Sequence, residues 1–311
     1  MGDDTHYLGI DIGGTKSAVS IMSEAGGVIA KERFPTQGEQ GPERGVAQMI
    51  EAGKRLLAGR EVPAIGISVG AMFDPQTGCF GAAPHLPSWE GFPVVKKISE
   101  AFALPVAADN DANACALAEW RYGAGRGTQH MAFLTFGTGL GAGLILNGRI
   151  YHGASALAGE IGATRVAETG PPVRGKPGCL EGFASGAGIA GLSRLRLTKF
   201  AGKTCVDENA TAAEVAKGAG EGDEFCLGIM REAGDYLGRG LAILLDLLNL
   251  EAVVIGSIFV RCEGLLRPSM EAALSRDAMV TTRSVCRILP AELGENIGDY
   301  AALALAVESG R

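Results

Sequence analysis

The chain has 311 residues, of which 35 are acidic and 28 basic, and its formal charge is −7 at neutral pH. This length exceeds one ordinary compact core and predicts two domains. The acidic balance argues against nucleic acid or an anionic membrane as the main partner. A small soluble ligand is therefore the expected partner.

The cysteine pattern argues against a secreted disulfide framework. Seven cysteines are scattered along the chain without a CxxC pair, namely Cys79, Cys115, Cys179, Cys205, Cys226, Cys262 and Cys286. The N-terminal stretch MGDDTHYLG is acidic and polar, unlike a secretory signal. The longest apolar run is interrupted by polar residues such as Arg239 and Asp246. We therefore expect a cytoplasmic protein.

The first predicted elements form a hairpin. Residues 7–12 (YLGIDI) and 17–22 (SAVSIM) have strand character and are joined by GGTK, in which glycine supplies positive φ. An amphipathic helix is predicted at 43–59 and a strand at 64–73. A further strand at 104–111 delivers polar residues at its end, and a helix that stops at glycine follows it.

A second hairpin repeats the plan of the first. MAFLTF (131–136) and AGLILNG (142–148) flank the glycine turn GTGLG. The repeat is about 124 residues, counted from Asp11 to Thr135. This spacing predicts two related halves, each of which begins with a hairpin around a glycine turn.

The remaining elements complete an alternating pattern. A long helix is predicted at 224–250, a buried strand at 251–257 and a C-terminal helix over IGDYAALALAVES. Strands alternating with helices predict an α/β protein with mixed sheets. We expect one domain at 1–117, joined by the C-terminal helix at about 296–311, and a larger one at 118–295.

The motif DIGGTK combines an acid with a glycine turn. Its backbone N–H groups can bind phosphate, and its carboxylate can hold a hydrated Mg²⁺. The alternative is a plain hairpin with a surface lysine. A P-loop is excluded because the GxxxxGK[ST] spacing is missing and a strand follows. GTGLGA is no dinucleotide fingerprint, since a strand follows it as well.

The stretch NDAN lies between a strand and a helix. Asn110 or Asp111 can simply cap that helix. The alternative makes Asp111 a general base that accepts a proton from a substrate hydroxyl, as phosphoryl transfer to an alcohol requires.

DIGGTK, NDANACALAEW and LTFGTGLGAGLILNGRIYHGASALAGEIG, in this order and at these separations, resemble the ROK family of bacterial sugar kinases and related repressors, within the actin/Hsp70/hexokinase superfamily. The resemblance runs from about residue 7 to the C-terminal helix. It implies a two-domain actin-like ATPase (ribonuclease H-like) fold with a central cleft for ATP, Mg²⁺ and a sugar. A homodimer is a further family-level expectation.

The resemblance also implies roles for individual residues. Asp111 matches the catalytic base. The positions that match the nucleotide-binding residues of the family are Asp11, Gly13, Gly14, Thr15, Lys16, Gly137, Thr138, Gly139 and Gly256. The Mg²⁺ that accompanies the nucleotide is expected near Asp11. The positions that correspond to the sugar-binding residues of the family are Gly70, His85, Asn110, Asp111, Glu160 and Glu181. Carboxylates suit this task because they accept hydrogen bonds from vicinal hydroxyls.

The zinc motif of the family is not kept. Typical members read ExGH followed by CxCGxxGCxE, and the histidine and three cysteines bind a structural zinc. Here Ala163 stands where the histidine would, Val173 to Gly175 cover the first two cysteines with one residue fewer, and Cys179 is left. One thiolate cannot complete a four-ligand site, so we predict no structural zinc and an inert or weakly reactive Cys179.

Three positions bear on the substrates. The histidine replaced by Ala163 also contacts the sugar in typical members, and His85 stands where the family commonly has asparagine, although a partly exposed loop histidine is the alternative. Together they predict a sugar other than ordinary glucose. On the adenine side the GG pair of the family is Gly256 and Ser257, and serine is strained there if positive φ is required.

Two function classes follow. The leading hypothesis is an ATP-dependent kinase of a hexose or hexose derivative, and the rival is a catalytically silent sugar sensor that acts through a protein partner. A DNA-binding repressor is not expected, because only seven residues precede Leu8 where repressors of the family carry a helix-turn-helix. A kinase that uses polyphosphate or acts on a carboxylate has no dedicated feature in its favour.

Overall fold

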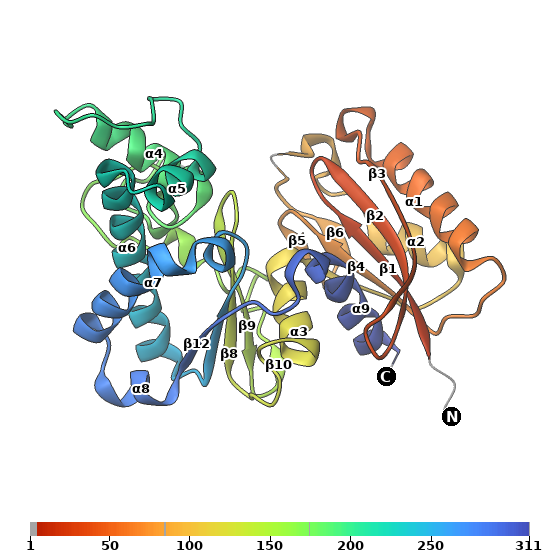
Figure 1. Cartoon of the computed structure of the whole chain (residues 1–311). Helices are drawn as coiled ribbons and strands as arrows, with labels where there is room; N and C mark the ends of the chain where they lie inside the picture. The colour runs from red at the N-terminus through yellow and green to blue at the C-terminus, as the bar shows by residue number, and fades with distance from the viewer. Residues whose placement is uncertain (1–4, 84, 174, 311) are drawn as a thin grey trace. The chain divides into compact units, whose positions relative to one another are not determined.

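The computed structural model describes residues 5–83, 85–173 and 175–310, which form two compact units (Figure 1). Unit 1 is built from the chain up to Arg126, His152–Ala158 and Leu293–Arg311, and unit 2 from Gly127–Tyr151 and Gly159–Glu292. Residue 118, where the sequence placed the domain boundary, lies inside a helix.

Unit 1 is organised around a five-stranded mixed sheet of order β3-β2-β1-β4-β7. Strand β2 pairs antiparallel with both β1 and β3, whereas β4 pairs parallel with both β1 and β7. The elements of this unit are β1 (His6–Ile12), β2 (Lys16–Ser23), β3 (Val28–Pro35), α1 (Pro42–Leu57), β4 (Ile65–Val69), β5 (Phe73–Asp74), β6 (Cys79–Phe80), α2 (Val94–Phe102), β7 (Val106–Asn110), α3 (Asp111–Tyr122), α9 (Ile297–Ser309) and the 3₁₀ turns η1 (Gly38–Gln40), η2 (Pro87–Trp89) and η5 (Gly294–Asn296).

Strand β1 shows how the sequence places the two faces of this sheet. Leu8, Ile10 and Ile12 alternate along it and enter a buried core together with apolar side chains of α1 and α2. The intervening residues face α9, where Gly9 allows close packing: a Cβ there would lie 3.0 Å from the Cβ of Ala302. Asp11 has the parity of Gly9 and therefore projects toward the start of α9.

Unit 2 contains a second five-stranded mixed sheet, of order β10-β9-β8-β11-β12. Strands β8, β9 and β10 pair antiparallel, and β8, β11 and β12 pair parallel. Its elements are β8 (Met131–Phe136), β9 (Leu140–Leu146), β10 (Arg149–Ile150), η3 (Ile161–Ala163), η4 (Leu180–Gly182), α4 (Gly186–Leu197), α5 (Ala212–Gly220), α6 (Glu224–Leu248), β11 (Ala252–Ile255), α7 (Ile258–Asp277), α8 (Val280–Val285) and β12 (Arg287–Pro290).

The long helix α6 packs closely on α7. A Cβ at Gly234 would lie 2.4 Å from the carbonyl oxygen of Leu266, and one at Gly238 would lie 2.3 Å from that of Met270. The two glycines therefore let the helix backbones approach each other at the level of these residues. Within the described part of the chain, no helix is long and apolar enough to cross a membrane.

Three predicted strands are shorter in the structure, and the one expected at 251–257 spans Ala252–Ile255. The strand expected at 64–73 spans Ile65–Val69; Gly70 still donates its N–H to the carbonyl of Ile12 at 2.8 Å, as the parallel ladder requires, and the chain leaves the sheet after it. The strand expected at 104–111 spans Val106–Asn110, and Asp111 is already the first residue of α3.

Candidate active site

The DIGGTK hairpin of unit 1 is closed by its own backbone. Gly13 donates its N–H to the carbonyl of Lys16 at 3.1 Å, and the hydroxyl of Thr36 donates to the carbonyl of Gly13 at 2.7 Å. Thr15 and Lys16 are exposed at the tip of the turn. The turn is thus fixed from behind, and its outer edge is open to a ligand.

The structure resolves which residue caps α3. The side-chain oxygen of Asn110 accepts the N–H of Asn113 at 2.9 Å, so Asn110 is the N-cap. Asp111 is the first helical residue, and the capping role considered for it from sequence is filled by its neighbour. Its carboxyl group is therefore available for chemistry.

The environment of Asp111 favours a proton acceptor that works near neutral pH. The pKa of Asp111 is raised to about 6, first because the surrounding protein removes part of its hydration and then because Asp11 carries a nearby negative charge. N–H groups of Ala112 and of Asp111 itself oppose this rise. The residue still keeps exposed surface, so a substrate hydroxyl can reach it.

Asp11 lies in a charged surrounding of its own. Its pKa is raised by burial and by the negative Asp299, while Lys31 and a hydrogen bond from Ser68 lower it. Asp299 forms an ion pair with Lys31 and is itself buried. The start of α9 is close, since a Cβ at Gly298 would lie 2.6 Å from a carboxylate oxygen of Asp11. The carboxylate oxygens of Asp11 suit a hard cation such as Mg²⁺.

A neighbouring pair, Asp109 and His152, was not singled out from sequence. Nε2 of His152 lies 2.6 Å from a carboxylate oxygen of Asp109, and this bond raises the pKa of the imidazole. The other oxygen of Asp109 accepts the N–H of Asn110 and the amide of Asn113, at 2.8 and 2.9 Å. Asp109 therefore braces the strand end that carries Asp111. Its place in AADND was a possible signal, whereas His152 had none.

The second glycine turn belongs to unit 2 and is braced by a carboxylate. Gly137 donates its N–H to the carbonyl of Gly139 at 3.1 Å. A side-chain oxygen of Glu181 accepts the N–H of Leu140 at 2.7 Å, and a Cβ at Gly139 would lie 2.7 Å from that oxygen. Thr138 is exposed between them. Glu181, which the resemblance assigns to the sugar, thus contacts the second glycine turn.

Gly256 and Ser257 follow strand β11. Gly256 donates its N–H to the carbonyl of Leu134 at 3.0 Å, and a Cβ there would lie 2.9 Å from the ring of Phe133. Ser257 has φ 53° and ψ −112°, a conformation that glycine adopts readily and serine does not. Ser257 therefore has the positive φ at which a serine backbone is strained.

The predicted sugar residues fall in both units. In unit 1, a Cβ at Gly14 would lie 2.7 Å from the Cβ of His85, so the exposed His85 stands against the first glycine turn. Gly70 adjoins the same turn, since a Cβ there would lie 3.5 Å from the Cα of Gly13. In unit 2, Glu160 is exposed and precedes η3.

The place of the family zinc motif is held by other contacts. Cys179 is buried, and its thiol lies 3.5 Å from the carbonyl oxygen of Ala163 as a hydrogen-bond donor. Arg165 and Cys179 form an isolated antiparallel bridge. A methyl group at Ala163 and one thiol do not make a tetrahedral donor set for zinc.

The chain is similar to known proteins over most of its length. The ROK family model matches residues 7–309. A glucokinase of Halalkalibacterium halodurans is 36% identical over 265 residues, which is 81% of this chain and 80% of the relative. A glucokinase of Thermotoga maritima is 29% identical over 97% of both chains.

Solved structures extend the likeness to three dimensions. A ROK hexokinase of Thermus thermophilus is 29% identical with a TM-score of 0.83, covering 98% of this chain and 99% of that one. A ROK glucokinase of Streptomyces griseus, solved with glucose and AMPPNP, is 28% identical with a TM-score of 0.78, over 97% and 99%. The predicted actin-like ATPase fold is confirmed, and because the family model spans nearly all of its residues, the chain belongs to the ROK family.

Proposed function

We propose that the protein is an ATP-dependent sugar kinase, which transfers the γ-phosphoryl group of ATP to a hydroxyl of a hexose or hexose derivative. The observation that carries the proposal is that two adjacent residues at the start of α3 have different roles. Asn110 caps the helix, and the adjacent Asp111 has a raised pKa and an accessible carboxyl group. The glucokinases at 36% and 29% identity support the same reaction.

Each group has a defined task in this reaction. Asp111 accepts the proton of the attacking hydroxyl, whose oxygen bonds to the γ-phosphorus while ADP leaves. When bound, Mg²⁺ neutralises phosphate charge, and Asp11 is the residue that would hold its hydration shell. The turns around Gly13 and Gly137 offer backbone N–H groups and exposed hydroxyls to the phosphates.

The sugar side is assigned to Gly70, His85, Asn110, Glu160 and the catalytic Asp111. Asn110 uses its amide oxygen as the helix cap, which leaves the NH₂ end for a sugar oxygen. His85 and Ala163 stand where typical members have other side chains, and they support a hexose derivative over plain glucose. Glu181 acts by holding the second phosphate turn, which its contact with Leu140 supports.

We further propose that the protein needs no structural zinc at the family motif. The Cys179 thiol facing the carbonyl of Ala163 supports this, because that hydrogen bond occupies the group that would bind the metal. A cytoplasmic homodimer is proposed as well. The exposed apolar residues Leu247, Met279 and Val280 of unit 2 support self-association, which light scattering after gel filtration measures.

The test is ADP release with Mg·ATP across hexoses, amino sugars, N-acetylated sugars and ketohexoses. One sugar should drive turnover, and Asp111→Ala should lower kcat by about 10²- to 10⁴-fold. Asp277→Ala removes an exposed carboxylate of unit 2 and should retain wild-type turnover. Full activity of Asp111→Ala would remove the proposed base.

A non-catalytic sensor is the alternative, because the Escherichia coli regulator NagC is 28% identical over 98% of this chain and 77% of the relative. In that case no sugar of the panel releases ADP, yet one of them raises the melting temperature of the protein.

A further inference from the structure

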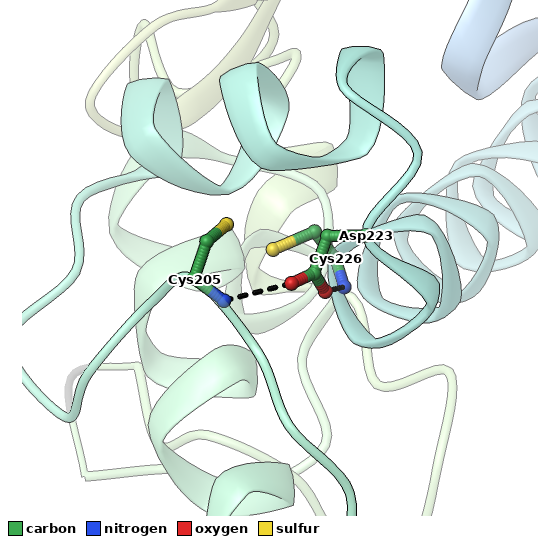
Figure 2. A group of neighbouring side chains, drawn as sticks. All are labelled: Cys205, Asp223 and Cys226. Carbon is green, nitrogen blue, oxygen red and sulfur yellow. Dashed lines mark hydrogen bonds between the residues drawn. The ribbon is translucent and has the colours of Figure 1, made fainter.

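A group of two thiols and a carboxylate lies in the helical part of unit 2. Cys205 precedes α5, Asp223 is the N-cap of α6, and Cys226 is three residues further along that helix. Their ligand atoms, two sulfurs and a carboxylate oxygen, all lie within 4.8 Å of one another. Figure 2 shows the two sulfurs pointing toward each other, with the carboxylate beside them. None of these residues has a part in the proposed kinase reaction.

The carboxylate of Asp223 is oriented before any ligand arrives. It accepts the N–H of Cys205 at 2.7 Å, the N–H of Cys226 at 3.0 Å and the hydroxyl of Thr204 at 3.1 Å. These donors tie the loop before α5 to the first turn of α6. Such outer contacts are what hold a metal-binding carboxylate in position.

Gly218 of α5 makes room for the two sulfurs. A Cβ at this position would lie 2.6 Å from Sγ of Cys205 and 2.8 Å from Sγ of Cys226. Any side chain here would push the thiols apart. The pair is thus enclosed from three segments of chain: the loop at Cys205, the α5 glycine and the α6 N-terminus.

The group is also reachable from solvent. Cys205 is exposed whereas Cys226 is buried. A cavity of about 260 Å³ opens beside Cys205, and its lining includes the acidic residues Asp207, Glu214 and Glu221. A cation can enter by this route, and a water molecule can occupy a fourth coordination position on the cavity side.

We propose that Cys205, Asp223 and Cys226 bind one zinc-like divalent cation. Two sulfur donors select a borderline-soft metal such as Zn²⁺ over Mg²⁺ or Ca²⁺, and a carboxylate is an accepted third ligand. Binding converts both thiols to thiolates and releases two protons. The bound cation joins the loop before α5 to α6 and stabilises this part of unit 2.

A disulfide between the same cysteines is the competing outcome. It would require an oxidant such as a low-molecular-weight disulfide, which accepts two electrons and leaves as two thiols. The carboxylate decides between the two, because it supplies a third donor to a cation and adds nothing to a sulfur–sulfur bond. The three-donor set therefore favours the metal.

The test uses the reduced full-length protein and Co²⁺ as a spectroscopic probe. One equivalent should give a thiolate-to-cobalt charge-transfer band in the near ultraviolet, which one equivalent of Zn²⁺ then abolishes. Zn²⁺ at about a hundredfold excess over its dissociation constant should raise the melting temperature by about 5 °C.

Three variants and a control localise the site. Cys205→Ser, at an exposed position, and Cys226→Ser should each abolish the band. Asp223→Asn keeps a helix cap but removes the charge, and should weaken Co²⁺ binding by about tenfold or more. Cys286→Ser, a half-buried cysteine outside the group, should bind as wild type. A band that survives in Cys205→Ser, or its absence from the wild type, would overturn the proposal. So would a two-hydrogen mass loss on treatment with oxidised glutathione without any cobalt band.

Discussion

In unit 1 the sheet order β3-β2-β1-β4-β7 corresponds strand for strand to β10-β9-β8-β11-β12 in unit 2. Parallel and antiparallel neighbours also correspond. In each unit the first two strands form the glycine hairpin, and the strand that pairs parallel with the first is followed by a glycine whose N–H bonds back to the hairpin. These are Gly70, bonded to Ile12 at 2.8 Å, and Gly256, bonded to Leu134 at 3.0 Å.

The corresponding positions carry different chemistry. The last paired residues before the turns are Ile12 with Ser17 and Phe136 with Leu140, so Asp11 corresponds to Thr135. The third parallel strand ends in Asn110 and leads to Asp111 in unit 1, but ends in Pro290 and leads to an alanine in unit 2. The same strand arrangement thus carries acidic residues in unit 1 and a neutral hairpin in unit 2.

The two turns are also held differently. The hydroxyl of Thr36 donates to a carbonyl of the first turn, whereas the carboxylate of Glu181 accepts an N–H at the second. The repeat therefore explains where the loops lie, and individual substitutions explain what each loop can do. Substitutions at matched positions of the two units test this difference in chemistry.

The largest expected difference between matched positions of the two units is at Asp11. Asp11→Asn should lower kcat by about a hundredfold or more, because the charge that attracts the Mg²⁺ hydration shell is lost. Thr135→Val, at the corresponding position in unit 2, should stay within about threefold of wild type. Steady-state kinetics at saturating ATP and sugar measure both. Equal losses in the two variants would contradict the assignment of the acid chemistry to unit 1.

The pH dependence should follow Asp111. The base must be ionised, so kcat/KM should fall as the pH drops below about 6, the raised pKa of this carboxyl. The same raised pKa has the opposite effect on stability, which falls as the pH rises. Because the folded pKa lies above the ordinary value of 3.8, ionised Asp111 disfavours the folded state, and this cost is fully present above pH 6 and absent below 3.8.

Asp111→Asn should therefore raise the melting temperature at pH 8 and leave it nearly unchanged at pH 3.5, where the wild-type carboxyl is mostly protonated. A thermal shift in the same direction and of the same size at both pH values would argue against a raised pKa.

A smaller effect is expected at Glu181. Glu181→Ala removes the acceptor of the Leu140 N–H, and Leu140 is buried, so the lost hydrogen bond costs about 1–3 kcal/mol. The KM for ATP should rise about tenfold as the second turn loses its support. Glu181→Gln retains an oxygen acceptor and should lie between wild type and Glu181→Ala. Identical KM values in all three proteins would contradict the bracing role.

The hairpins and the C-terminal helix could be predicted because local pattern determines them. Alternating apolar residues flank both glycine turns, and IGDYAALALAVES coincides with α9. The same local pattern could not reveal the pairs formed by distant segments. Asp109 meets His152, and Asp11 shares its surroundings with Asp299 across most of the chain length. Strand ends were also missed where apolar residues continue past the last paired residue, as in the segment from Gly70 to Phe73.

Ser257 gives the finest distinction between the halves. It follows Gly256 with φ 53°, whereas Ala71 follows the corresponding Gly70 and is not among the described residues with positive φ. Ser257→Gly should therefore stabilise the protein by about 1 kcal/mol, since glycine adopts this conformation without strain. Ala71→Gly should destabilise it by about 0.5–1 kcal/mol or more, because the unfolded chain gains entropy and the Cβ that packs against the unit 1 core is lost. Urea unfolding with an unchanged m-value measures both differences. The same sign for the two variants would show that the serine is relaxed and that the two loops are equivalent after all.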